Sequence, residues 1–391
     1  MTPPLARSDF PVTEHWNYLN HAGVAPLPTP AVEAMGGYAE RVAAGGSLVV
    51  EQHGARAEEV RATAARLMGV PCRDLAFVKN TTEGLGFVAN GLTWRPGDRV
   101  VVPDYEFPST VYPWLALEDL GVVIDLVTPR GQGGCLPVEA FVDTMAAGPP
   151  PKLVCTSWVQ FGRGWRTDLA GLAAACHDVG ALLCADVIQG LGVVPAQLAA
   201  WGVDFAMADA HKWLLGPEGI GVLYVAGRCL HLLRPLEPGW ASVAHREQWD
   251  NRELIWHDDT RRLEGGSSNT AGIHAMGASV DLLERVGVEV IWRHVDGLCD
   301  RACAGLAEAG ATVLSDRSPE GRSGVVTFRL EGHDPATLHR VLAHRGIVCS
   351  PRGGGIRIAP HGYNTTEEID HLVAGVRELD GRSGRGGDRS L

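Results

Sequence analysis

Residues 182–219 read LLCADVIQGLGVVPAQLAAWGVDFAMADAHKWLLGPEG, and two apolar runs in this stretch decide the fold. The runs at 182–186 and 205–208 are short and apolar, which is typical of buried strands in a parallel sheet. Open α/β sheets place their ligand-binding groups at the carboxyl ends of the strands. Asp186 ends the first run, and Asp209, His211 and Lys212 follow the second. We therefore expect these four side chains to meet at one edge of a sheet.

Strand-like and helix-like segments alternate along most of the chain, which predicts an α/β fold with a largely parallel sheet. Helices broken by Gly-Gly pairs are expected over 31–68, and further helices over 83–91 and 169–179. The expected strands are 75–79, 99–103, 122–127, 152–159, 182–186, 205–208 and 219–225.

The pattern changes near residue 270, where a smaller C-terminal domain is expected to begin. Helices at 270–286 and 288–309 precede strand-like runs at 312–314 and 323–330, and a helix at 335–345, a glycine-rich segment and a final helix at 365–379 follow. The expected division is an N-terminal segment over 1–22 that lines the active site, a large domain over 23–260, a small domain over 261–380 and a disordered tail over 381–391.

The composition excludes several classes of protein. The 391 residues carry 34 Lys and Arg against 46 Asp and Glu, a net charge of −12 with neutral His, which argues against nucleic-acid binding. No apolar run is long enough for a membrane helix, and the first residues lack the apolar core of a signal peptide, so a cytoplasmic protein is expected. The nine cysteines form no CxxC pair, and no cluster is typical of a metal site.

Only three lysines occur, Lys79, Lys152 and Lys212, so few residues are candidates for an amine nucleophile. Arginine stays protonated and cannot take that role. A lysine beside a buried carboxylate suits an aldehyde cofactor with a pyridine ring, because the amine joins the aldehyde and the carboxylate keeps the ring nitrogen protonated. The alternative is that Asp186 only caps a loop and Lys212 is an ordinary surface lysine.

A second motif lies in LAFVKNTTEGLGFV, residues 75–88, where an expected strand leads through Asn80 and Thr81 into a helix. Threonine side chains and free backbone N–H groups at a helix N-terminus form a site for anions. Such a site suits the phosphate of a cofactor. The alternative is an ordinary capped helix, which has the same pattern.

With these motifs, the chain resembles the class V aminotransferase group of pyridoxal 5′-phosphate (PLP) enzymes, which have fold type I. The group includes cysteine desulfurases, cysteine and cystine lyases, isopenicillin N epimerase-like proteins and kynureninases. The resemblance runs from about residue 18 to residue 379 and is most specific in ADAHKWLLGPEG, residues 208–219. It implies PLP as cofactor, a large PLP-binding domain with a mostly parallel seven-stranded sheet, and a smaller α+β C-terminal domain.

The resemblance also assigns roles to single residues around the cofactor. Lys212 would be joined covalently to PLP, Asp186 would pair with the pyridinium nitrogen, and Gln189 would hydrogen-bond the 3′-oxygen of the ring. His211 would contact the phosphate or the surroundings of the lysine. The phosphate itself would be cradled by Thr81 and Thr82.

Three further segments match the family near the cofactor. In DYEFPSTVYPW, residues 104–114, Phe107 has the place of the aromatic residue or histidine that stacks on the ring. In SWVQFGRG, residues 157–164, Gln160 has the place of a polar group near the 3′-oxygen and the substrate. In RRLEGGSSNTAG, residues 261–272, Ser267 would reach the phosphate of the neighbouring subunit, which implies a homodimer with active sites at the interface.

The resemblance implies a small-molecule substrate, an amino acid. In CSPRGGGIRIAPHGYNTTEEID, residues 349–370, Arg357 is expected to bind the α-carboxylate, because a guanidinium offers two parallel N–H donors. Arg352 is a second candidate, in a loop flanked by glycine. Asn20 and His21, in YLNHAGVAPLP at residues 18–28, match the segment that lines the substrate mouth.

Two positions depart from the family pattern. Many members have a serine three residues before the lysine as a phosphate ligand, whereas this chain has Asp209, which a phosphate dianion would repel unless the carboxylate is protonated or turned away. Desulfurases that form a persulfide carry a cysteine on the loop after the first C-terminal arginine. Here that loop, 352–357, has no cysteine, and Cys349 is expected in a strand. Sulfur capture as a protein persulfide is therefore disfavoured.

The leading hypothesis is a PLP-dependent lyase that cleaves the C–S bond of cysteine or a cysteine S-conjugate by β-elimination, for instance in secondary metabolism such as a lincosamide-like antibiotic pathway. Arg357 would hold the carboxylate while Lys212 removes the Cα proton as general base. The alternatives are decarboxylating or oxidative deamination of such a conjugate, epimerisation, transamination and a non-catalytic PLP-binding role. The side-chain pocket or the core could include Trp158, Phe161, Trp165, Trp240 and Trp256.

Overall fold

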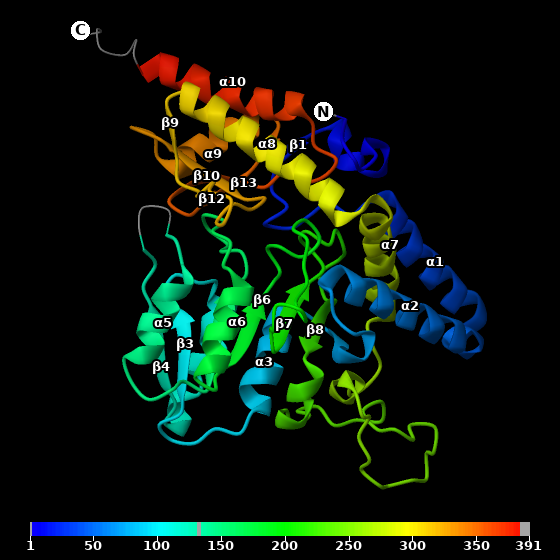
Figure 1. Cartoon of the computed structure of the whole chain (residues 1–391). Helices are drawn as coiled ribbons and strands as arrows, with labels where there is room; N and C mark the ends of the chain where they lie inside the picture. The colour runs from blue at the N-terminus through cyan, green and yellow to red at the C-terminus, as the bar shows by residue number, and fades with distance from the viewer. Residues whose placement is uncertain (1, 131–133, 384–391) are drawn as a thin grey trace.

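The computed structural model describes residues 2–130 and 134–383, which form a seven-stranded sheet, a four-stranded sheet and a two-stranded sheet, with helices packed around them (Figure 1). The strands of the larger sheet are β2 (Leu75–Val78), β3 (Arg99–Pro103), β4 (Val123–Val127), β5 (Leu153–Ser157), β6 (Leu182–Asp186), β7 (Phe205–Asp209) and β8 (Gly221–Val225). They lie in the order β2-β8-β7-β6-β5-β3-β4, and only β8 runs antiparallel to its neighbours. The predicted α/β fold with a mostly parallel seven-stranded sheet is confirmed.

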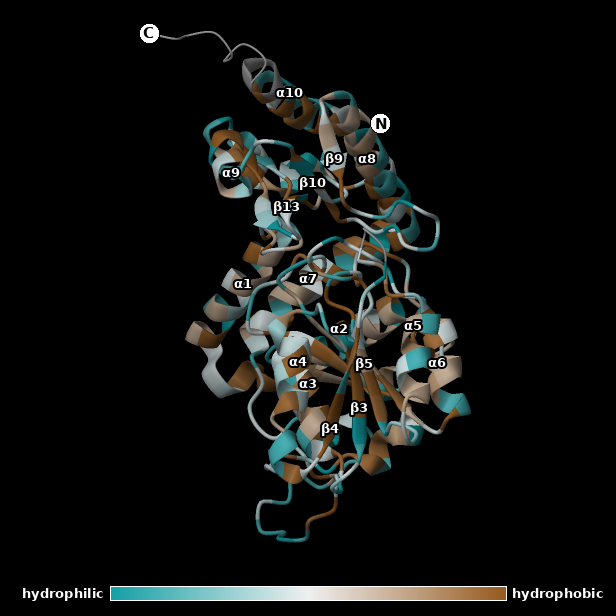
Figure 2. Cartoon of the chain, turned by 90° about the vertical axis from the view of Figure 1, so that its left-hand side faces the viewer, coloured by the Kyte–Doolittle hydropathy of each residue, from teal (hydrophilic) through white to brown (hydrophobic). Residues whose placement is uncertain are grey.

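Helices cover both faces of this sheet, as the connections between parallel strands require. Four of them are α3 (Thr81–Gly91), α4 (Pro108–Leu115), α5 (Val138–Ala146) and α6 (Leu169–Asp178). Figure 2 shows the hydrophobic strands β3 and β5 between α3 and α4 on one side and α5 and α6 on the other. Every residue of β3, β5 and β7 is buried, whereas the edge strand β4 leaves Leu126 exposed.

Three more helices pack together at one flank of the large sheet: α1 (Thr29–Gly45), α2 (Val50–Met68) and α7 (Thr270–Val286) (Figure 1). The break predicted within 31–68 falls at Gly46, where φ is +51°, while Gly36 and Gly37 lie inside α1. The sequence-based division assigns α7 to the small domain, but this helix packs against α1 and α2. Only the segments after α7 contribute to the second sheet.

The second sheet is antiparallel and consists of β9 (Ala311–Val313), β10 (Val326–Leu330), β12 (Ser350–Arg352) and β13 (Gly355–Ile358), in the order β12-β13-β10-β9. Helices α8 (Val288–Glu308) and α9 (Pro335–His344) contact its strands, and α10 (Thr366–Ser383) packs on α8. The N-terminal segment joins this part, because β1 (Asn17–Tyr18) pairs in parallel with β11 (Ile347–Val348). The predicted tail begins inside α10, and residues 384–391 lie outside the described residues.

One cluster of buried apolar side chains runs through both parts, from Val100 and Val154 in the large sheet to Val326 and Ile356 in the small one. The two sheets are therefore held against each other by a shared hydrophobic core. Within residues 2–130 and 134–383, no helix combines the length and the apolar character needed to cross a bilayer.

Candidate active site

A pocket of about 450 Å³ opens at the carboxyl ends of β5, β6 and β7, where the large sheet faces the β12–β13 hairpin. Asp186, Asp209, His211 and Lys212 all line it, so the four side chains expected at one sheet edge do meet there. Further walls come from the N-terminal segment and from the hairpin. The predicted site residues that line the pocket are Asn20, Thr81, Thr82, Phe107, Asp186, Gln189, His211, Lys212, Arg352 and Arg357.

Lys212 and Asp186 provide an amine and a fixed carboxylate. Burial lowers the pKa of Lys212 to about 8, because desolvation of the ammonium outweighs the attraction of Asp186. The carboxylate accepts the backbone N–H of Ile188 at 3.0 Å and the hydroxyl of Thr110 at 3.1 Å. Burial raises the pKa of Asp186, and these two hydrogen bonds and Lys212 oppose that shift. The pocket thus holds an easily deprotonated amine near an acid of fixed orientation.

The N-terminus of α3 supplies a cradle for an anion. Asn80 caps the helix by accepting the backbone N–H of Glu83 at 2.9 Å. The N–H groups of Thr81 and Thr82 occupy the first two helical positions and have no carbonyl partner within the helix. The Thr82 and Ser109 hydroxyls are 2.9 Å apart. Free donors at the positive end of a helix dipole suit a phosphate group.

Arg357, on β13, is prepared to bind a carboxylate. Its Nη1 donates to the carbonyl of Phe161 at 2.5 Å, and its Nη2 lies 3.5 Å from Oδ1 of Asn20. Its buried Nε has no hydrogen-bond partner among the described residues. Burial, and then the charge of Arg352, lower the pKa of Arg357 to about 10. Nη2 donates one N–H to Asn20, so the N–H of Nε and the second N–H of Nη2 are left for a bidentate anion.

The β12–β13 hairpin places both arginines on the pocket side. Ser350 pairs with Arg357, and Arg352 pairs with Gly355, so these positions share one face of the hairpin. Gly353 and Gly354 form the turn with φ of +65° and +84°, a conformation that glycine adopts without strain. The tip is docked on the large sheet, because the carbonyl of Gly353 accepts Nε of Arg163 at 3.0 Å. The glycine-rich segment expected between the helices at 335–345 and 365–379 thus includes a hairpin that forms one wall of the pocket.

Together these groups fit a phosphorylated pyridine aldehyde such as PLP. The aldehyde would meet the amine of Lys212, the ring nitrogen the carboxylate of Asp186, and the phosphate the N-terminus of α3. Phe107 offers an aromatic face, since Nζ of Lys212 lies 5.5 Å from its ring centroid. The buried Nε of Arg357 has no hydrogen-bond partner in the described part of the chain, as expected of a group kept for a ligand.

Three predicted positions have other surroundings. His21 is fully buried outside the pocket lining, with Nδ1 2.7 Å from the carbonyl of Ala359 and Nε2 2.8 Å from the hydroxyl of Tyr363. Gln160 also lies behind the wall, where its Oε1 accepts the backbone N–H groups of residues 162 and 163. Gln189 lines the pocket, but its Nε2 donates to Ala22 and its Oε1 accepts from Trp213. The roles implied for these side chains stay predictions.

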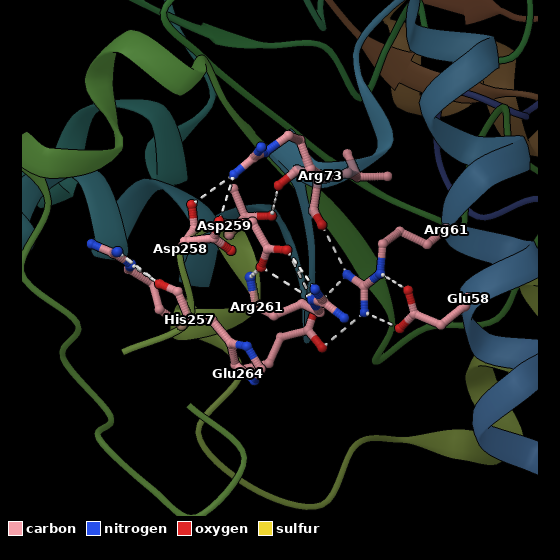
Figure 3. A network of polar contacts seen from close by, with 11 residues as sticks. Glu58, Arg61, Arg73, His257, Asp258, Asp259, Arg261 and Glu264 are labelled. Atoms are coloured by element: carbon pink, nitrogen blue, oxygen red, sulfur yellow. Dashed lines mark hydrogen bonds and ion pairs between the residues drawn. The ribbon is translucent and has the colours of Figure 1, made fainter. Parts of the chain in front are cut away.

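Ser267 is absent from this lining and instead lines a second pocket of about 170 Å³ with Lys79 and Glu83. The segment before it is anchored by Glu264, which forms an ion pair with the buried Arg61 at 2.5 Å (Figure 3). Glu264 also accepts the backbone N–H of residue 77 in β2 at 2.8 Å. The serine-bearing segment is therefore fixed to the strand that leads into the anion cradle.

Glu106 is a site residue that the sequence reasoning missed. It follows β3 at the same sheet edge, where its carboxylate accepts the backbone N–H of Ser157 at 2.7 Å and the hydroxyl of Ser157 at 2.6 Å. Burial raises the pKa of Glu106 to about 7. Ser157 lines the pocket, so Glu106 supports the wall from behind. The sequence signal that could have identified Glu106 is its position just after an apolar strand, where ligand-binding groups gather.

Of the five aromatic residues that the sequence places either in the side-chain pocket or in the core, only one lines the pocket. Phe161 lines the pocket, and Trp158 is buried in the core against Trp201. Trp165 packs against the core, Trp240 is half-exposed, and Trp256 pairs with Val243 in an isolated bridge. Within residues 2–130 and 134–383, no group of three or more His, Cys, Asp or Glu side chains is arranged to hold a metal ion.

The lowered pKa of Lys212 predicts selective acetylation of the cofactor-free protein, because acetic anhydride attacks only neutral amines. Half of Lys212 is neutral near pH 8, whereas the Glu83 carboxylate raises the pKa of Lys79. Labelling across a pH series, followed by peptide mass spectrometry, should give a midpoint near pH 8 for Lys212 and a higher midpoint for Lys79. Equal midpoints for the two lysines would contradict the desolvation of Lys212.

Known proteins resemble this chain over nearly its whole length. The family model of the class-V aminotransferases matches residues 17–372. A probable cysteine desulfurase of Methanothermobacter thermautotrophicus is 30% identical over 397 residues, which cover 96% of this chain and 97% of that protein. A cysteine desulfurase structure from Thermococcus onnurineus is 26% identical with a TM-score of 0.86, covering 96% of this chain and 97% of that one. A structure of C-DES with glycine linked to its PLP cofactor has the same fold, with a TM-score of 0.87. It is 23% identical, and the match covers 95% of this chain and 99% of that one.

Proposed function

The chain belongs to the class-V aminotransferase family of PLP-dependent enzymes, and from this premise we propose that it is a lyase that cleaves the C–S bond of cysteine or of a cysteine S-conjugate. The observation that carries the proposal is a pocket in which Lys212, Asp186 and the free edge of Arg357 converge and which no cysteine lines. The relatives named cysteine desulfurases support cysteine as the common part of the substrate.

Each of three side chains in the pocket would have its own role in such a reaction. When bound, PLP supplies an electron sink for the negative charge that develops at the substrate Cα. Arg357 holds the α-carboxylate through its Nε–Nη2 edge and so fixes the direction of the Cα–H bond. Lys212 takes the Cα proton as general base, a role that its lowered pKa favours. Asp186 stabilises positive charge on a ring nitrogen placed beside it.

The electron pair released from the Cα–H bond forms a Cα–Cβ double bond and expels the sulfur from Cβ as a thiolate, which takes up the proton that Lys212 removed from Cα. Hydrolysis of the remaining three-carbon fragment then gives pyruvate and ammonia. One molecule of water is consumed for each thiol released, and no external oxidant or reductant is required.

The released sulfur is proposed to leave as a free thiol instead of being passed to an enzyme cysteine. All nine cysteines lie within the described residues, and none of them lines the pocket. The turn of the β12–β13 hairpin consists of Gly353 and Gly354, so it offers no thiol, and Cys349 is buried. Burial also raises the pKa of Cys349 to about 12, which disfavours its nucleophilic thiolate.

A product assay tests this proposal. Purified enzyme loaded with PLP should convert L-cysteine or an S-alkyl-L-cysteine into equimolar pyruvate, ammonia and thiol, as followed by mass spectrometry and thiol titration. Cys349→Ala should retain this activity, because no cysteine accepts the sulfur. Transfer of the amino group to an added keto acid without release of thiol would contradict the lyase assignment, and so would epimerisation or loss of CO₂ without release of thiol.

We further propose that the active unit is a homodimer. Ser267 lies on a second pocket instead of the main one, which is consistent with a phosphate contact made across an interface. The loop around 240–255 extends from the large sheet and exposes Trp249, Leu254 and Ile255, a group of apolar side chains that a partner surface would cover (Figure 1).

Sedimentation analysis of the wild-type chain should give twice the chain mass of 41.7 kDa. Replacing the exposed Leu254 by aspartate should shift the protein toward monomer, because a charge at an apolar interface is costly to bury. Glu253→Asp, a neighbouring change that preserves charge, is the matched control. A fully active monomer would contradict the dimer proposal.

The setting of the reaction stays a prediction. We propose a cytoplasmic enzyme that acts on thioether conjugates of secondary metabolism, for instance in a lincosamide-like antibiotic pathway. The support is the family resemblance, since substrates of this type carry the cysteine moiety that the pocket is proposed to bind.

A further inference from the structure

Asp209 places an unsatisfied carboxylate at the anion cradle. It ends β7, lines the main pocket and has a side chain that is only 8% exposed. Its backbone N–H donates to the hydroxyl of Thr81 at 3.1 Å, which fixes it beside the N-terminus of α3. Its Oδ1 lies 3.0 Å from Nδ1 of His211, yet neither atom has a partner in hydrogen-bond geometry among the described residues. Most buried polar atoms are hydrogen-bonded, so an unsatisfied pair beside a pocket indicates a role in binding a ligand or a proton.

The charges around Asp209 do not compensate for a phosphate. His211 and Lys212 follow it in the chain, Asp186 faces it from β6, and β8 contributes no charged residue. On the side of α3, Lys79 is paired with Glu83 at 2.7 Å and is mostly exposed. Arg352 and Arg357 belong to the hairpin wall that faces the substrate. His211 is thus the group beside the carboxylate whose second ring nitrogen can accept a proton.

A bound phosphate ester changes the electrostatics of this pair. It brings about 1.5 to 2 negative charges near neutral pH. If Asp209 is ionised and His211 is neutral, the pair carries a net charge of −1. This buried charge would repel the phosphate. One added proton converts the pair into a carboxylate and an imidazolium with no net charge, and Nε2 of His211 becomes a second N–H donor in addition to Nδ1.

We propose that Asp209 and His211 act as a proton-storing pair that takes up one proton from solvent when the phosphate of the cofactor binds. Nδ1–H of His211 then donates to Asp209, and Nε2–H becomes available to the phosphate. The affinity for the phosphate falls with rising pH as this proton becomes harder to acquire. The inference rests on PLP binding, the premise of the proposed function, and is independent of the reaction that follows.

Calorimetry with the cofactor-free enzyme tests the proton uptake directly. The probe is pyridoxine 5′-phosphate, which lacks the aldehyde and cannot join Lys212. Above about pH 7 its phosphate is already a dianion and takes up little proton on its own account. Titrations in two buffers with different ionisation enthalpies should show uptake of about one proton by the wild type and much less by Asp209→Asn. Equal uptake by the two proteins would overturn the proposal.

Affinities provide a second, independent readout. Between about pH 7 and about pH 9, the Kd of the wild type should rise by up to about tenfold per pH unit relative to that of Asp209→Asn. Lys212 and Asp186 are present in both proteins, so their own titrations largely cancel in this ratio. His211→Gln should weaken binding, and adding Asp209→Asn to it should restore binding, since the repelling charge is then gone. An Asp209→Asn chain that loses affinity by the same factor at every pH would overturn the proposal.

Two controls separate this pair from its surroundings. Thr82→Val removes an uncharged hydroxyl from the same cradle and should lower the affinity equally at all pH values while proton uptake persists. Pyridoxine without phosphate should bind wild type and Asp209→Asn alike. Should Asp209→Asn not fold, Asp209→Ser, which also removes the carboxylate, supplies the same comparison of proton uptake with the wild type. Failure of pyridoxine 5′-phosphate to bind the wild type would overturn the cofactor assignment, and with it the proposed function.

Discussion

Replacing Lys212 by alanine should lower kcat for thiol release by at least about 10⁴-fold, because the variant loses both the covalent anchor and the general base. No other amine can take over, since Lys79 and Lys152 do not line the pocket. The visible absorbance of the lysine-bound cofactor should disappear, which a spectrum of the purified protein detects before any substrate is added. Turnover is measured by thiol release.

Lys152→Ala is the matched control for this substitution. Lys152 directly precedes β5, at the opposite end of that strand from the pocket, and its ammonium is paired with Asp98 at 2.8 Å. This variant should keep both the absorbance and the turnover of the wild type. The assignment of Lys212 would be wrong if its alanine variant kept turnover within tenfold of the wild type.

Replacing Asp186 by asparagine should lower kcat by about 10²–10³-fold, the second-largest effect expected of a single substitution. Asparagine retains the size of the side chain but not its charge, so a ring nitrogen beside it loses the electrostatic support for its proton. Asp186 is buried and bonded to Ile188 and Thr110, and no other acid occupies its place. Steady-state kinetics with saturating PLP separate this effect from weaker cofactor binding.

Thr110→Val provides the control for the geometry of Asp186. It removes the hydrogen bond of 3.1 Å to Oδ2 but leaves the charge, so kcat should fall by only about tenfold. Full activity in Asp186→Asn would refute the role of its charge. A loss in Thr110→Val as large as that in Asp186→Asn would show that orientation, and not charge, is the essential contribution.

Much of the fold follows from the sequence where one physical signal dominates. The runs at 99–103 and 182–186 match β3 and β6 because strands buried on both faces are continuously apolar. The helix at 270–286 matches α7, whose first turn is capped by the side chain of Asn269. Where signals conflict, the prediction fails. No helix is expected over α4, because it contains two prolines. Pro108 is tolerated since it lies in the first turn, whereas Pro113 lies inside the helix.

The site was predictable to the extent that it depends on strand ends. Asp186 and Lys212 are placed by the rule that ligand groups gather at the carboxyl edge of a parallel sheet. The environment of His21 could not be predicted, because its partners Ala359 and Tyr363 are more than three hundred residues away in the chain. The same holds for Arg357, whose orientation depends on its bond to the carbonyl of Phe161, in the turn that follows β5.

The two walls of the pocket belong to different sheets. The amine, its carboxylate and the anion cradle come from the large parallel sheet, whereas Arg352 and Arg357 come from a short antiparallel hairpin. Substitutions in that hairpin can therefore change which amino acid is accepted while the groups that hold the coenzyme stay intact.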